Sequence, residues 1–129
     1  MEKFKVLIVD DEPDFLETII KRLQARNIDV AGAESGHQAL ELIGDRDFDV
    51  VILDVKMPGL DGIDTLREIK KKKPLLEVIM LTGHASVESG IQGMQLGAFD
   101  YVMKPVALDE LLEKMRQAYE RKLIQEGKG

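Results

Sequence analysis

Apolar residues fall into two kinds of pattern along this chain. Five short runs are mainly apolar and end in polar or turn-forming residues, which predicts β-strands. The first run is almost continuously apolar, as is typical of a strand covered on both faces. The five expected strands are residues 4–9, 28–33, 49–54, 77–81 and 98–103.

The segments that follow the strands place apolar residues at helical spacing. Pro13 suits the first turn of the first helix, Ser35 suits the N-cap of the second, and Gly44 is expected to close the second helix. The five expected helices are residues 13–27, 36–43, 63–73, 86–96 and 108–123.

The fourth expected helix is the weakest of the five. Gly90 and Gly93 each destabilise it by about 1 kcal/mol relative to Ala, so we expect it to be the least stable helix. Gly97 fits the left-handed position that ends it.

The alternation of strands and helices predicts the fold class. Right-handed crossovers give a parallel sheet with helices on both faces, a doubly wound, flavodoxin-like α/β sandwich. The common five-stranded order 2-1-3-4-5 places its switch point between the first and third strands, and ligands bind at such points. By length the chain is one domain, with residues 1–124 folded and residues 125–129 as a frayed tail or the start of a linker.

Composition narrows the function classes. The formal net charge is −6, which argues against direct nucleic-acid binding and against binding to an anionic membrane. The lysines of residues 70–73 are interpreted as the solvated end of a helix. The chain has no cysteine and no apolar run near the roughly 20 residues that span a bilayer, so we expect a cytoplasmic protein.

Three carboxylates follow adjacent strands of the expected sheet. Asp10 and Asp11 come after the first strand and Asp54 ends the third, so all three should meet at the switch point. Their mutual repulsion would raise their pKa values unless a cation neutralises them. Oxygen ligands of this kind suit Mg²⁺, or Mn²⁺ in its place.

Two further polar residues stand at the ends of the outer strands. The ammonium of Lys104 can place a positive charge beside one phosphoryl oxygen. The hydroxyl of Thr82 can donate a hydrogen bond to another phosphoryl oxygen. The set favours phosphoryl transfer to Asp54 as the nucleophile, followed by water attack on the acyl phosphate.

These residues belong to longer motifs at the strand ends, namely Asp10-Asp11, residues 54–62, Leu81-Thr82-Gly83 and residues 101–105. In them, and over nearly its whole length, the chain resembles the receiver domain of two-component response regulators. The resemblance implies that Asp54 is the phosphoacceptor. It also implies a chain that catalyses its own phosphorylation and slow autodephosphorylation but acts mainly as a signalling switch. Residues 82–85 and 97–101 are most similar to receivers that precede ATPase-type transcriptional activators.

The resemblance also implies roles for the other residues. Asp10 and Asp11 would hold the metal together with Asp54 and the backbone carbonyl of Lys56. Thr82 and Lys104 would bind the phosphoryl group, Tyr101 would be the aromatic switch residue beside Thr82, and Lys104–Pro105 would be a cis peptide bond. The partner would be a sensor histidine kinase or a phosphotransfer protein. Phosphorylation would change the face made by the fourth helix, fifth strand and last helix, and would promote a partner contact or a homodimer.

Three alternatives share parts of this pattern. A flavodoxin-like binding module would need a phosphate-binding loop after the first strand, where residues 10–13 are acidic. An aspartate-nucleophile phosphatase would place a second Asp where Lys56 stands. A non-phosphorylated adaptor would keep the fold without the chemistry, and a Mg²⁺ titration would distinguish it.

Overall fold

One sheet of five parallel strands organises the protein, with strand order β2-β1-β3-β4-β5. The computed structural model describes residues 4–57, 59–83 and 87–127. The expected helix start at Ser86, the motif residues His84 and Ala85, Pro58 and the last two residues lie outside this part of the chain. The elements are β1 (Lys5–Val9), α1 (Pro13–Gln24), β2 (Asp29–Ala33), α2 (Gly36–Asp45), β3 (Val50–Asp54), α3 (Gly62–Lys72), β4 (Glu77–Thr82), α4 (Val87–Gln95), β5 (Asp100–Met103) and α5 (Leu108–Gln125).

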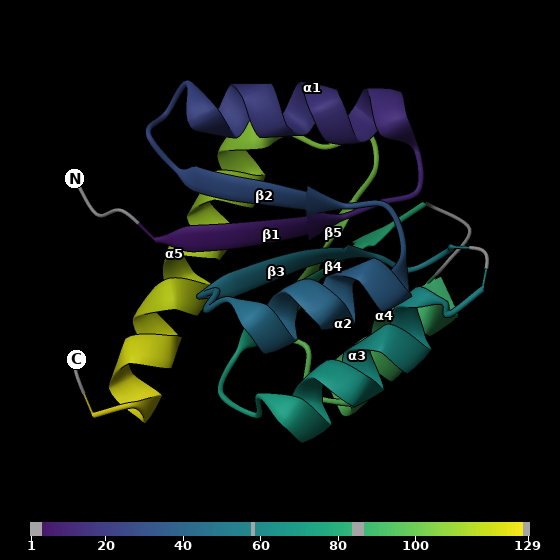
Figure 1. The fold of residues 1–129 in the computed structure, drawn as a ribbon, viewed down its shortest axis with the longest axis vertical. Coiled ribbons are helices and arrows are strands. Elements are labelled where there is room, and N and C mark those ends of the chain that lie inside the picture. The colour runs from purple at the N-terminus through teal and green to yellow at the C-terminus, as the bar shows by residue number, and fades with distance from the viewer. Residues whose placement is uncertain (1–3, 58, 84–86, 128–129) are drawn as a thin grey trace.

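Helices cover both faces of the sheet (Figure 1), which confirms the predicted three-layer fold and strand order. Alternate residues of β3 explain the two apolar layers. Val50 and Ile52 pack in the layer under α1 and α5, whereas Val51 and Leu53 pack in the layer that α2 and α3 cover. Burying each of these side chains contributes about 1.5 to 3 kcal/mol. The sheet is therefore anchored from both sides, and its strand ends hold fixed positions.

Two helix ends differ from the prediction for reasons that the structure shows. α1 stops at Gln24 because Asn27 turns into the left-handed region with φ 63°, and the Ile28 N–H donates to the Leu23 carbonyl at 3.2 Å. The Asn27 N–H also donates to the Gln24 carbonyl at 2.9 Å, and the two bonds form a Schellman motif with Asn27 in the position that glycine usually takes. The expectation that Gly44 closes α2 is wrong, since the helix runs through Gly44 to Asp45.

The other element ends agree with the prediction to within two residues. The Ser35 hydroxyl caps α2 by accepting from the Gln38 N–H at 3.1 Å. Gly97 ends α4 with φ 104°, and the Ala98 N–H bonds back to the Gly93 carbonyl, so β5 begins later than expected, at Asp100. α5 extends to Gln125. Within the described residues, no helix is both long enough and apolar enough to pass through a bilayer.

Candidate functional site

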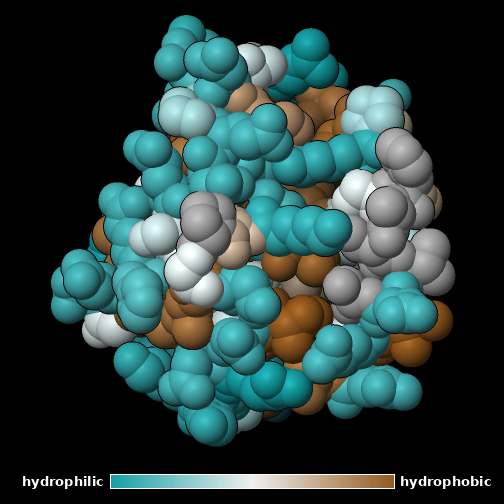
Figure 2. Space-filling model, turned by 90° about the vertical axis from the view of Figure 1, so that its right-hand side faces the viewer, coloured by the Kyte–Doolittle hydropathy of each residue, from teal (hydrophilic) through white to brown (hydrophobic). Residues whose placement is uncertain are grey.

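The acidic site lies at the carboxyl ends of the two central strands. β1 and β3 pair in register with Val9 opposite Leu53, so the residues that follow, Asp10 and Asp54, emerge side by side. Asp11 joins them, and one carboxylate oxygen from each of the three lies within 4.8 Å of the others. The strand arrows in Figure 1 point toward the face that Figure 2 views, which is mainly hydrophilic with hydrophobic side chains in a hollow below its centre. The topology thus converts two distant sequence motifs into one cluster of oxygen donors.

Burial and neighbouring charges change the pKa of Asp54. Its side chain is almost wholly enclosed. Burial, reinforced by the neighbouring Asp10 carboxylate, raises the pKa of Asp54 from 3.8 to about 6, although Lys104 and the Lys56 N–H oppose the rise. That N–H donates to Asp54 Oδ1 at 3.4 Å. Because the charged form of Asp54 is disfavoured, a bound cation would stabilise it.

Lys104 reaches into the cluster from the end of β5. Its Nζ lies 2.9 Å from Asp10 Oδ2, 3.4 Å from Glu12 Oε1 and 3.7 Å from Asp54 Oδ2. Burial alone would lower the pKa of Lys104, but the hydrogen bond and charge of Asp10 raise it, so the ammonium stays protonated. The peptide bond between Lys104 and Pro105 is cis.

Thr82 and Tyr101 occupy the neighbouring strand ends. Thr82 is buried at the end of β4, and its carbonyl accepts from the Lys104 N–H at 2.8 Å. The Tyr101 ring is exposed on β5. Gly90 of α4 lies close to both, because a Cβ built there would stand 3.8 Å from the Tyr101 ring and 4.0 Å from the Thr82 methyl group. Thr82 and Tyr101 therefore border the same small space beside α4.

The loop after β3 is held close against the strand. The Gly62 N–H donates to the Val55 carbonyl at 2.9 Å, and a Cβ on Gly62 would overlap the backbone of Asp54 and Val55. Asp61 caps α3 by accepting from the Asp64 N–H at 2.9 Å. Lys56, whose backbone lies beside the carboxylates, has an exposed side chain.

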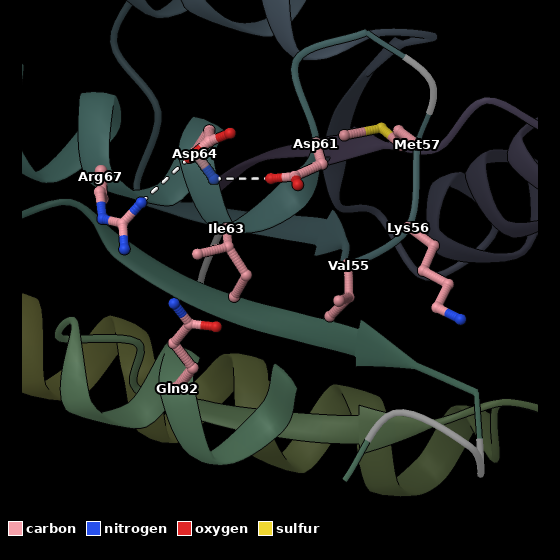
Figure 3. A pocket seen from close by; sticks show the side chains of 8 residues that line it. All are labelled: Val55, Lys56, Met57, Asp61, Ile63, Asp64, Arg67 and Gln92. Atoms are coloured by element: carbon pink, nitrogen blue, oxygen red, sulfur yellow. Dashed lines mark hydrogen bonds and ion pairs between the residues drawn. The ribbon is translucent and has the colours of Figure 1, made fainter. Parts of the chain in front are cut away.

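A groove of about 580 Å³ opens beside this loop, between α3 and α4. Figure 3 shows Val55 and Ile63 on one side of the groove and Gln92 on the other. Arg67 on α3 pairs with Asp64 at 3.0 Å. The groove is adjacent to the acidic cluster, since Val55 directly follows Asp54.

The oxygen donors fit a hard divalent cation. The side chains of Asp10, Asp11 and Asp54 offer carboxylate oxygens and no nitrogen or sulfur ligand. Mg²⁺ takes one or two carboxylates, keeps several waters and accepts substrate oxygens in its remaining positions. This donor set matches that requirement better than it matches zinc or copper.

Sequence reasoning missed two neighbours of Lys104. Glu12 contacts the ammonium, and the ring of Phe15 lies beneath it at 4.6 Å from Nζ to the ring centroid. The sequence places Phe15 only within the expected helix of residues 13–27. Phe15 lies in the first helical turn after the acidic residues that follow β1, and this position could have indicated that it lies beside the site.

Mg²⁺ is expected to stabilise the protein in the absence of any phosphate compound. Binding to the native state alone raises the free energy of unfolding by about 1.4 kcal/mol when the cation exceeds its dissociation constant about tenfold. Thermal unfolding with and without Mg²⁺ measures this rise. Asp11→Asn should reduce it strongly, whereas Asp14→Asn, which changes an exposed acid on α1, should keep it. A melting temperature that Mg²⁺ leaves unchanged would contradict a cation site here.

Comparison with known proteins defines the class. The model of the response regulator receiver domain matches residues 6–116. The chain therefore belongs to the response regulator receiver domain family, which is part of two-component systems. The family resemblance seen in the sequence is confirmed.

Individual relatives agree with this assignment. The transcriptional regulatory protein ZraR of Escherichia coli O157:H7 is 38% identical over 117 residues, and response regulator MprA of Mycolicibacterium vanbaalenii is 37% identical over 125 residues. These alignments cover 91% and 97% of this chain, but only 26% of ZraR and 54% of MprA.

Solved structures show the same fold. A response regulator receiver domain protein from Clostridium thermocellum is 40% identical with a TM-score of 0.91, and the alignment covers 95% of this chain and 98% of that one. NtrX from Brucella abortus is 32% identical with a TM-score of 0.91, covering 98% of this chain and 29% of NtrX. The chain thus corresponds to one domain of the larger proteins.

Proposed function

We propose that this receiver domain accepts a phosphoryl group on Asp54 from a phosphohistidine of a sensor histidine kinase or a phosphotransfer protein. The observation that carries the proposal is the cluster of Asp10, Asp11 and Asp54 within 4.8 Å, with the Lys104 ammonium 3.7 Å from Asp54 Oδ2. A nucleophile, metal ligands and a phosphoryl-binding cation are the parts that phosphoryl transfer requires. As a soluble signalling domain it would act in the cytoplasm.

The reaction would proceed by in-line displacement at phosphorus. One carboxylate oxygen of Asp54 forms the new P–O bond, while the bond from phosphorus to the donor nitrogen breaks and its electron pair stays on the imidazole. Mg²⁺, or Mn²⁺, held by Asp10, Asp11, Asp54 and the Lys56 carbonyl, would neutralise charge on the phosphoryl oxygens. The ammonium of Lys104 and the hydroxyl of Thr82 would hold the other oxygens. Hydrolysis reverses the state when water attacks phosphorus and the carboxylate leaves.

The test is phosphorylation with acetyl phosphate, followed by intact-mass measurement. We expect one added phosphoryl group in Mg²⁺ and none in EDTA, with fragmentation locating the group to Asp54. Mn²⁺ should support the same uptake. Labelling that persists in EDTA, or that maps to another residue, would refute the assignment.

Phosphorylation would change the surface that a partner contacts through movements of Thr82 and Tyr101 beside Gly90. A phosphoryl group on Asp54 offers the Thr82 hydroxyl a new acceptor, and movement of Thr82 toward it would let the Tyr101 ring turn inward. Lys114 of α5 donates to the Tyr101 carbonyl at 3.0 Å and pairs with Asp100 at 2.9 Å, so β5 and α5 are joined. A coupling free energy of about 1 to 3 kcal/mol is typical of such switches.

The face that would respond carries exposed apolar side chains. Ile91 and Met94 on α4 and Tyr101 and Met103 on β5 are each between 41% and 55% exposed. Apolar residues left in water at one face favour a protein contact there. We therefore infer that phosphorylation promotes a partner contact or a homodimer through α4, β5 and α5, and that in a longer protein it would control an output domain.

Thr82→Ala should separate phosphorylation from the response. The variant keeps Asp54, the metal ligands and Lys104, so it should still gain one phosphoryl group, although more slowly. The Tyr101 ring and α5 should then keep their unphosphorylated NMR shifts, whereas in the wild type these shifts should change. Thr18→Ala, on the exposed side of α1, is the matched control. Equal shift changes in Thr82→Ala and wild type would contradict this route.

A further inference from the structure

Among the described residues, four groups lie around the Lys104 ammonium, and one of them is aromatic. The carboxylates of Asp10, Glu12 and Asp54 lie 2.9 to 3.7 Å from Nζ. The fourth group is the ring of Phe15, whose centroid is 4.6 Å from Nζ. An ammonium over an aromatic face at this distance is attracted by the negative potential of the ring.

The position of Phe15 is fixed by its surroundings. It lies in the first turn of α1, directly after the loop that carries the acidic residues, and its half-buried ring packs against the apolar layer under α1 and α5. Lys104 comes from the opposite direction, at the end of β5. The ring is therefore a rigid surface against which a flexible four-carbon side chain rests.

The three carboxylates do not by themselves fix where the ammonium lies. Glu12 is mostly exposed and can follow the ammonium outward, and Asp10 would be drawn partly away by a bound cation. The Phe15 ring is uncharged and packs against the apolar layer under α1 and α5, so a change of charge at the site should not draw it away. Of the four contacts, this one should therefore depend least on the charges of the site.

We propose that Phe15 is a positioning residue for phosphoryl transfer, holding the Lys104 ammonium over its ring face and within reach of the phosphoryl group on Asp54. The proposal rests on the proposed function, and it assigns to α1 a part in the chemistry. Phe15 touches Lys104 and not the reacting atoms, so it acts through the lysine.

The described residues include three other cations near aromatic rings, and they provide a comparison. Arg46 lies 5.2 Å from the Phe48 ring, Arg121 lies 5.5 Å from Phe99 and Lys114 lies 5.8 Å from Tyr101. All three distances are longer than that between Lys104 and Phe15. Phe48 lies at the other end of the sheet, just before β3, and is the matched control.

The experiment replaces Phe15 with mono-, di- and trifluorophenylalanine, which keep the shape of the ring and progressively remove its negative face. Single-turnover phosphorylation by acetyl phosphate, at saturating Mg²⁺, is the readout. We expect the rate constant to fall stepwise along the series, by about three- to tenfold in total, with the half-saturating Mg²⁺ concentration unchanged. The same series at Phe48 should leave the rate constant unchanged.

A second measurement needs no phosphorylation. The ε-methylene protons of Lys104 should show an upfield ring-current shift in the unphosphorylated wild type, which Phe15→Leu should remove and Phe15→Trp should keep. Rates that are equal across the fluorinated series, or an ε-methylene shift that Phe15→Leu leaves in place, would overturn the role of Phe15. Wild-type protein that takes up no phosphoryl group would instead overturn the proposed function, and the role of Phe15 with it.

Discussion

Replacing Asp54 with Asn is expected to abolish phosphoryl uptake and, without Mg²⁺, to raise the free energy of unfolding by about 2 to 3 kcal/mol at about pH 8. The first effect follows from the loss of the nucleophile. The second follows from the pKa of Asp54, which burial and the Asp10 carboxylate raise from 3.8 to about 6 in the native state. A raised carboxyl pKa means that ionisation costs more in the folded protein than in the unfolded chain.

The sign of the pH dependence follows from this difference. At about pH 4 the native carboxyl is mostly protonated and the penalty is nearly absent, and it grows as the pH rises and is complete above about pH 7. The stabilising effect of Asp54→Asn should therefore be small at about pH 4 and full at about pH 8. Urea denaturation at the two pH values measures it. Asp29→Asn, at an exposed acid on β2, is the control and should stay within about 0.5 kcal/mol of wild type.

Equal free energies of unfolding for Asp54→Asn and wild type at both pH values would show that ionisation of the Asp54 carboxyl does not destabilise the native state. If saturating Mg²⁺ did not reduce the stabilisation of Asp54→Asn relative to wild type, the cation would not be offsetting the cost of ionising Asp54. A phosphorylated Asp54→Asn protein would remove Asp54 from the chemistry altogether.

Gly62→Ala is expected to destabilise the protein by about 2 to 3 kcal/mol and to disturb the site. A Cβ at Gly62 would collide with the Asp54 carbonyl and would stand 2.6 Å from Val55 Cα, and these are backbone atoms that a side-chain rotation cannot move. The loop that carries Lys56 would have to shift. Weaker stabilisation by Mg²⁺ should accompany the loss of stability.

Gly44→Ala is the matched control. Gly44 lies inside α2, and no described atom beyond its chain neighbours and the backbone of α2 lies within 4 Å of an added Cβ. Alanine should therefore stabilise the helix by about 0.5 to 1 kcal/mol. The two substitutions add the same methyl group and should act with opposite sign in chemical denaturation. Destabilisation of similar size in both variants would mean that crowding against β3 is not the cause.

The convergence of Asp10, Asp11 and Asp54 could be predicted because it depends only on topology. Strand periodicity and short turns identified the strands, and the common order 2-1-3-4-5 of five-stranded doubly wound sheets then indicated which strand ends are neighbours. No side-chain detail enters that inference. The same reasoning predicted the strand order, which the structure confirms.

Contacts between long side chains could not be predicted in this way. Glu77 was assigned as the first residue of the fourth strand, yet it is fully buried between Arg121 Nε at 2.8 Å and Lys70 Nζ at 3.8 Å. Burial raises the pKa of Glu77, whereas both cations oppose the rise. Periodicity indicates which way a residue points but not which flexible side chain from a distant helix reaches it. Phe15 beneath Lys104 is a case of the same kind.

The strand order also predicts that different parts of the site differ in how readily they unfold locally. β1 and β3, which carry the three carboxylates, each have a neighbouring strand on both sides, whereas β5, which carries Tyr101 and leads to Lys104, forms one edge of the sheet. Amide protons of the central strands should exchange with solvent only when the whole domain unfolds, and those of β5 through smaller local openings. Native-state hydrogen exchange would measure both. The nucleophile and the metal ligands thus stand on or directly after the strands that open least, whereas Tyr101 stands on an edge strand, where opening requires less free energy.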